Sequence, residues 1–138
     1  MKAVAGMVEA SAYVLEDIQK ELDTAHASLS SYLRKSSRAV SAKQDRAAYE
    51  KGLEGFLGAL ERTMGEYPHD EELKRFYERF YAFYSQRNDL DPRDQLEKIS
   101  SLLSDLKSMV HWRKMETSYG RSLGFSDFRS LRGESKKR

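Results

Sequence analysis

The chain has 138 residues, of which 33% are charged and 39% hydrophobic, with two prolines, eight glycines and no cysteine. This composition is typical of a helix-rich globular domain, and it excludes a disulfide scaffold, thiol chemistry and a largely disordered chain. No apolar run approaches the length of a membrane span, and the apolar start is too short for a signal-peptide core. We therefore expect one domain, with no transmembrane segment and a cytoplasmic location.

The net charge of +2 is divided unevenly along the chain. Residues 119–138 carry a net charge of +4, which leaves −2 on the rest. A dedicated DNA-binding domain would show a broad basic face instead. The body of the chain is therefore not expected to be such a domain.

The first predicted helix covers about residues 4–33. Apolar or small residues recur there at spacings of four and then alternately three and four, which is the heptad pattern of a helix that packs against other helices. Two of them, Ser11 and Ala25, are small enough to let a neighbouring helix approach closely. The positions of this seam are Val4, Val8, Ser11, Leu15, Ile18, Leu22, Ala25, Leu29 and Tyr32.

The second helix is predicted to begin at Ser41, which has the capping-box spacing to Gln44. Its interior contains three glycines, each of which costs about 1 kcal/mol relative to alanine. We expect either a close helix–helix contact over them or a softened helix that rearranges on binding. The glycines are Gly52, Gly55 and Gly58, and the seam contains Tyr49, Leu53, Phe56 and Leu60, followed by Met64 or Tyr67.

The third helix is aromatic: six of the nine residues from Phe76 to Tyr84 are Phe or Tyr. It follows a turn at Tyr67–Glu72, where Pro68 suits a first helical turn, and it is predicted to end near Gln86. At about 100° per residue, the aromatics separate into two edges of the helix. The Phe edge (Phe76, Phe80, Phe83) is predicted to lie in the core. The Tyr edge (Tyr77, Tyr81, Tyr84) is predicted either to bond within the domain or to bind a protein partner.

The fourth helix is predicted to start with Asp91 as its N-cap and Pro92 in the first helical position. It should run to about Tyr119, where Gly120 would end it. Its seam positions are again spaced three and four apart and are Leu96, Ile99, Leu103, Leu106 and Val110.

Short connections between helices make sequential helices antiparallel neighbours, so the sequence predicts an all-α fold, an up-down-up-down four-helix bundle over residues 1–119. Residues 120–138 form a basic, partly ordered tail with a short apolar docking segment. Its anchors are expected either to fold back onto the bundle or to bind a protein partner. These anchors are Phe125, Phe128 and Leu131.

Basic residues gather where the turn between the first and second helices and the turn between the third and fourth would meet. This pole is expected to be a solvated, charge-mixed end, or alternatively a contact for phosphate, anionic lipid or nucleic acid. Its members are Arg34, Lys35, Arg38, Lys43, Arg46, Arg87 and Arg93.

The main candidate for catalytic chemistry is a pair of residues. Arg62 and His69 have the Arg-x6-His spacing, which resembles the ribonuclease motif of the HEPN helical-bundle family, although Thr63 stands where that motif has Asn, Asp or His. The resemblance implies that the arginine steadies a phosphate and the histidine transfers a proton. The histidines have no spacing suited to a metal, so no metal, cofactor or small-molecule substrate is expected.

These patterns favour a non-enzymatic helical protein–protein interaction module, such as an adaptor, an assembly subunit or a secretion-type chaperone. A protein partner, self-association or both are expected, through the aromatic helix and the tail. Nucleic-acid binding through the basic pole is the first alternative, and a HEPN-like ribonuclease is the second.

Overall fold

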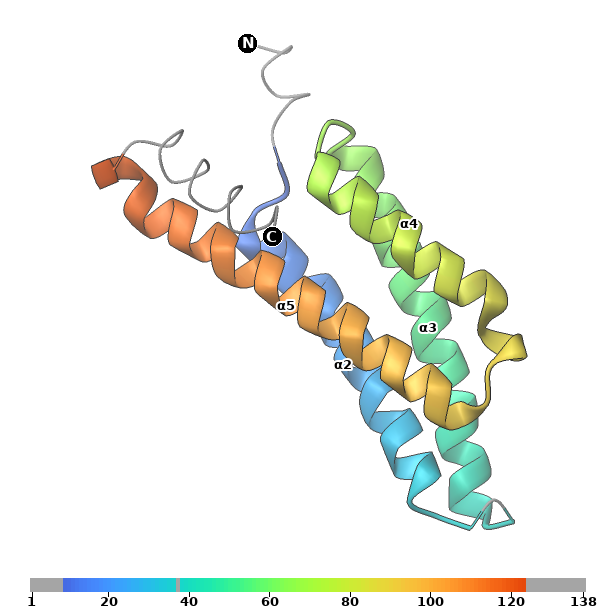
Figure 1. Cartoon of the computed structure of the whole chain (residues 1–138). Helices are drawn as coiled ribbons and strands as arrows, with labels where there is room; N and C mark the ends of the chain where they lie inside the picture. The colour runs from blue at the N-terminus through green and yellow to red at the C-terminus, as the bar shows by residue number, and fades with distance from the viewer. Residues whose placement is uncertain (1–8, 37, 124–138) are drawn as a thin grey trace.

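The computed structural model describes residues 9–36 and 38–123, with side chains described as far as Glu116. Four α-helices form this part of the chain: α2 (Ala12–Leu33), α3 (Val40–Glu66), α4 (Glu71–Gln86) and α5 (Pro92–Leu123), with a short 3-10 helix, η1 (Arg87–Asp89), before α5. Successive helices run in opposite directions, and α5 returns to pack against α2 (Figure 1). The predicted all-α four-helix bundle is confirmed.

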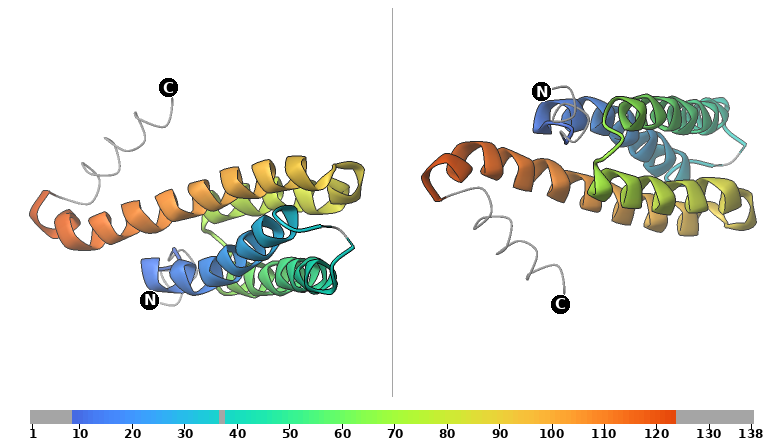
Figure 2. Two further views of the ribbon diagram at one scale, coloured as in Figure 1. Left: turned by 90° about the horizontal axis from the view of Figure 1, so that it is seen from below. Right: turned by 90° about the horizontal axis from the view of Figure 1, so that it is seen from above.

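The lengths of the helices differ from the prediction. α2, which corresponds to the first predicted helix, begins at Ala12, because Ser11 acts as its N-cap and accepts a hydrogen bond from the N–H of Val14 at 3.2 Å. With 22 residues it is shorter than α3 and α5. The longest helix is α5, with 32 residues, and its C-terminal end extends beyond the other helices (Figure 2).

α2 and α3 approach each other closely at their middle. A Cβ atom placed on Gly52 would lie 3.1 Å from the Cβ of Ala25, which is tighter than ordinary van der Waals contact. The glycine therefore serves the close helix contact that the sequence predicted, and Ala25 is the small partner across it. Around this point the predicted seams are buried, including Leu22, Leu29 and Leu53.

The start of α3 does not use the predicted capping box. The helix begins at Val40, and its N-cap is Ala39, which makes no side-chain capping hydrogen bond. Ser41 is therefore the second helical residue and is exposed. The capping-box spacing alone does not locate the start of a helix, because a Ser and a Gln three residues apart also occur inside helices.

The phenylalanine edge of α4 lies in the core, as predicted. Phe76 and Phe80 are fully buried, and both rings meet Phe56 of α3 edge to face, with centroids 6.2 and 4.8 Å apart. Phe83 continues the edge and is 7% exposed. These rings fill the space between α4 and α3, so the backbone of α4 lies farther from its neighbours than that of α2 does from α3.

The start of α5 follows the prediction and its end does not. Asp91 accepts a hydrogen bond from the N–H of Asp94 at 2.9 Å, and Pro92 is the first helical residue. The helix continues through Gly120 to Leu123, beyond the predicted end at Tyr119. A helix-interior glycine costs about 1 kcal/mol, which a long helix can tolerate.

A buried charged cluster fixes the start of α4 against α5 and the segment before α2. Asp70 is the N-cap of α4 and accepts from the N–H of Leu73 at 3.1 Å. Arg113 of α5 donates to both Asp70 oxygens, at 2.6 and 2.9 Å, and to Glu72 at 3.1 Å. The same two side chains hold Ala10, whose N–H donates to Asp70 at 3.0 Å and whose carbonyl accepts from Arg113 at 2.8 Å.

The ionisation of this cluster follows from its contacts. Burial by itself would raise the pKa of Asp70, but the hydrogen bonds and charge of Arg113 outweigh it and hold that pKa below its ordinary value. Burial would likewise lower the pKa of Arg113, yet Asp70 and Glu72 raise it. Both groups are therefore charged in the folded protein, and the carboxylate and the guanidinium stabilise one another.

A neutral buried network fixes the opposite end of α4. The hydroxyl of Tyr49 in α3 donates to Gln95 of α5 at 2.7 Å, and both side chains are buried. Gln95 in turn donates to the carbonyls of Arg87 and Leu90 at 2.8 and 3.0 Å. Burial raises the pKa of Tyr49, so its hydroxyl stays protonated and keeps donating.

Candidate protein-interaction surface

The tyrosine edge of α4 faces the outer side of α3. Tyr77 is half-buried, and its hydroxyl donates to Glu61 of α3 at 3.1 Å. Burial and this contact with Glu61 raise the pKa of Tyr77, so the hydroxyl remains a donor. One of the three predicted partner-binding tyrosines therefore bonds within the bundle.

Tyr81 is the exposed member of the tyrosine edge. Its side chain is 47% exposed, and its ring stacks on Tyr77 with centroids 5.7 Å apart and planes 21° from parallel. Because Tyr77 is held by Glu61, the exposed ring of Tyr81 lies on a support that is itself anchored to α3.

Tyr84 belongs to the packed part of the same edge. It is half-buried, its ring lies 6.0 Å from that of Phe80, and the Arg87 guanidinium lies 4.0 Å from its centroid. Arg87 also donates to Glu50 of α3 at 3.1 Å, so Tyr84 is covered by an ion pair. Among the predicted tyrosines, the bundle leaves Tyr81 accessible.

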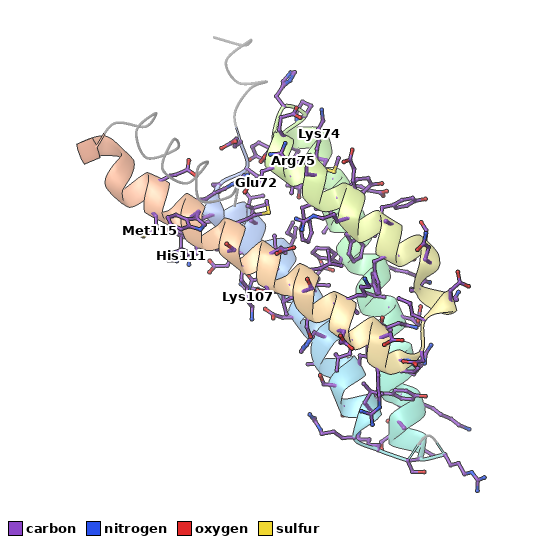
Figure 3. The ribbon with its side chains drawn as sticks, in the orientation of Figure 1. Glu72, Lys74, Arg75, Lys107, His111 and Met115 are labelled. Carbon is purple, nitrogen blue, oxygen red and sulfur yellow. The ribbon has the colours of Figure 1, made fainter. Side chains whose placement is uncertain are left out.

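The other flank of α4 borders a groove against α5. The groove has two hollows of about 290 and 480 Å³ that share Arg79 and Asp105. These two side chains form an ion pair across the groove between α4 and α5. In Figure 3, Glu72 and Arg75 lie on the first turns of α4 above this groove, and His111 lies on the side of α5 away from α4.

The floor of the groove is apolar. Phe83 and Leu102 are each 7% exposed and Met109 is 5% exposed, so their surfaces just reach the groove. Trp112, the single tryptophan of the chain, is half-buried at one end. The sequence does not predict this groove directly, although Leu102, Met109 and Trp112 lie beside the predicted seam of α5 with a heptad-like spacing.

The predicted basic pole exists, but acidic side chains neutralise part of it. Lys35 pairs with Asp45 at 2.8 Å, and Lys35 is the main cause that lowers the Asp45 pKa. Arg46 and Arg87 both pair with Glu50, at 3.8 and 3.1 Å. The remaining four cations are exposed, and none forms an ion pair with the described residues; they are Arg34, Arg38, Lys43 and Arg93.

A hollow of about 440 Å³ lies at this pole, between the end of α2 and the start of α5. Tyr32 and Leu33 line one side, and Asp91, Pro92 and Arg93 line the other. The two predicted turns therefore meet at one end of the bundle. Asp91 places a negative charge among the cations, so the pole has the charge-mixed character that the sequence predicted.

Arg62 and His69, the residues of the predicted ribonuclease pair, are both exposed. Arg62 is exposed near the end of α3, and His69 is exposed in the turn that precedes α4. No hydrogen bond or ion pair joins these two described side chains. Thr63, at the position where the HEPN motif has a polar partner, is buried and donates to the carbonyl of Ala59 at 2.8 Å.

Two further observations concern only the described part of the chain. No group of three His, Asp or Glu side chains within residues 9–36 and 38–116 is placed to hold a metal ion. No helix there combines the length and apolar character needed to cross a membrane. The predicted tail anchors Phe125, Phe128 and Leu131, like the seam positions Val4 and Val8, lie outside the described residues.

Comparison with known proteins identified no relative of this chain. No protein-family model matches the chain, and no curated protein or solved structure matches it significantly.

Proposed function

We propose that this protein is a non-enzymatic helical interaction module that binds another protein through the exposed side of α4. The observation that carries the proposal is the Tyr77–Tyr81 pair. One ring is anchored to α3 by a hydrogen bond, and the other stacks on it and is 47% exposed. Exposed aromatic rings held in place by neighbours are typical anchors of protein interfaces, since little side-chain entropy is lost on binding.

The position of α4 supports the same proposal. Its Phe edge and the two polar networks at its ends fix the helix, so a partner would meet a preorganised surface. Preorganisation lowers the free-energy cost of association, because neither the helix nor the ring pair must be ordered on binding.

A photocrosslinking experiment tests the proposal. Tyr81 is replaced by p-benzoylphenylalanine in the full chain, and the same replacement at Tyr13 is the matched control, because Tyr13 is 73% exposed on α2. In cells of the source organism, position 81 should give a covalent adduct with one defined protein, and position 13 should not. Adducts of the same kind and yield at both positions, or none at position 81, would overturn the proposal.

Nucleic-acid binding is a second candidate, favoured by the four exposed cations of the basic pole and by Tyr32, which lines the hollow at this pole together with Arg93. An aromatic ring beside cations suits single-stranded nucleic acid, where bases stack and phosphates are neutralised. Binding to a labelled single-stranded RNA should then weaken steeply with added salt. Replacement of Arg34, Arg38 and Arg93 by Gln should abolish it, whereas unchanged binding in this variant would exclude the pole.

A further inference from the structure

We infer that the groove between α4 and α5 binds an amphipathic α-helix of a partner protein, whose apolar stripe is flanked by acidic side chains. This inference rests on the proposed function, since it names the element of the partner that the α4 surface accepts. Two features of the groove carry it: its shape, and the sign of the charges along it.

The shape suits a helix rather than a compact small molecule. The lining residues of α4 run from Glu72 to Gln86, and those of α5 run from Lys98 to Trp112. At 1.5 Å per residue each row is roughly 21 Å long, which corresponds to about four helical turns. Two parallel rows of this length with an apolar floor are the geometry of helix-in-groove recognition.

The side chains along the groove allow close approach. Its floor contains Phe83, Leu102 and Met109, with Trp112 half-buried at one end as a large aromatic anchor. Apart from the Arg79–Asp105 ion pair, which crosses the groove between the two hollows, the exposed positions beside the floor are small, so a helix could lie close to the floor on either side of that pair. These small positions are Ala82, Ser101 and Ser108.

The charges select an acidic partner. Arg79 is paired with Asp105, and the buried Arg113 is shared by Asp70 and Glu72, so all of these side chains already have partners within the bundle. Arg75 and Lys98, towards opposite ends of the groove, are exposed. Neither forms an ion pair with the described residues, so each presents an exposed, unpaired cation at its end of the groove. The same positive charge disfavours residues 119–138 of this chain as the occupant of the groove, because they carry a net charge of +4.

A designed peptide provides the probe. It has about 18 residues, enough for the four turns of the groove plus its ends, with Leu at helical positions i, i+3, i+7, i+10 and i+14. Glu flanks the Leu stripe in one version and Lys in a matched version, and neither contains Trp. Because the protein has a single tryptophan, a change in Trp112 emission reports occupation of the groove in the full chain.

The acidic peptide should bind roughly tenfold more tightly than the basic peptide at low salt, and the ratio should shrink as salt screens the end charges. Trp112→Ala, measured with a labelled peptide, should weaken binding roughly tenfold or more, as expected for a large aromatic anchor of an interface. Equal binding of both peptides, or tighter binding of the basic one, would contradict the inference.

Two pairs of variants locate the binding site. Ala82→Glu should abolish binding because it places a bulky charge in the groove, whereas Ala47→Glu makes the same exposed change on α3 and should have no effect.

Arg75→Gln with Lys98→Gln should remove the preference for the acidic peptide. Lys51→Gln with Arg62→Gln makes the same change in net charge outside the groove and should preserve the preference.

Other occupants give different results. If the tail filled the groove, Phe128→Ala with Leu131→Ala in the full chain would strengthen peptide binding several-fold. If a second copy filled it, the protein would sediment as a dimer that Trp112→Ala dissociates. Either result overturns the inference. Failure of both peptides to bind also overturns it, while specific adducts at position 81 would leave the proposed function standing.

Discussion

The contact between α2 and α3 is made by small residues, whereas the contact between α4 and α3 is made by large aromatic side chains. α2 and α3 meet where Gly52 faces Ala25, and the backbones approach until a single added Cβ would be crowded. α4 instead rests on Phe56 of α3 through the rings of Phe76 and Phe80. Small residues close the first contact, whereas rings hold α4 at a greater distance from its neighbours.

This difference explains why the candidate surfaces lie beside α4. A helix held away from its neighbours by rings leaves its flanks open, one as the Tyr81 surface and the other as the groove against α5. α4 therefore has few close backbone contacts, and the polar networks at its two ends hold it in position instead. The following variants test the two contacts in order of expected effect.

The largest effect is expected from the ring layer beneath α4. Phe80→Ala removes a fully buried ring that packs on Phe56 and should lower the free energy of unfolding by about 4 kcal/mol. Urea unfolding followed by circular dichroism measures this loss. Tyr81→Ala at the adjacent, exposed position is the control, and an equal loss in both variants would contradict the assigned orientation of α4.

The buried ion pair should come next. Asp70→Asn removes the carboxylate that Arg113 bonds through two nitrogens, leaving Glu72 as its remaining carboxylate partner, and should destabilise the protein by about 3 kcal/mol at neutral pH. Asp91→Asn is the matched control, since Asp91 is an exposed N-cap and asparagine caps equally well. A similar loss in both variants would show that capping, rather than the ion pair, accounts for the effect.

The stability of the same pair should depend on pH in a defined direction. The folded-state pKa of Asp70 is lowered, so the carboxylate contributes its full stability above its unfolded value of about 3.9 and loses it as the pH falls through the folded value. The difference between wild type and Asp70→Asn should therefore be constant near neutrality and shrink below about pH 4. A difference that stays constant at lower pH would contradict the assignment.

A moderate effect is expected at the close contact of α2 and α3. Gly52→Leu forces a side chain against Ala25 and should destabilise the bundle by about 2 kcal/mol. Gly65→Leu is the control, because a Cβ at Gly65 meets nothing within 4 Å and leucine favours the helix. The control should be neutral or slightly more stable, so the sign of the two changes distinguishes steric crowding from helix propensity.

The smallest effect on stability is expected on the exposed side of α4. Tyr81→Ala removes a half-exposed ring and should change the free energy of unfolding by less than about 0.5 kcal/mol. Loss of the partner complex with this variant, at unchanged thermal stability, would separate a binding role from a structural one. A large loss of stability would instead show that the ring belongs to the core.

The sequence predicted the fold well because heptad spacing and turn residues are local signals. The Phe edge of α4, the cap at Asp91 and the close contact at Gly52 were all predicted from spacing and residue size. Helix ends were less accurate: Ser11 was interpreted as a seam position and is an N-cap, and Gly120 lies inside a helix. In each case a residue compatible with two local conformations was assigned to the wrong one.

The sequence by itself determined that the part of the chain described by the structure forms four amphipathic helices and that α4 carries separate Phe and Tyr edges, because both follow from positions within one helix. The tertiary structure alone decided which tyrosine is accessible, since that depends on Glu61 of the neighbouring helix. It also brought Arg113 to Asp70 and joined the flanks of α4 and α5 into a groove. Such contacts join residues far apart in the chain, and no periodicity within one helix encodes them.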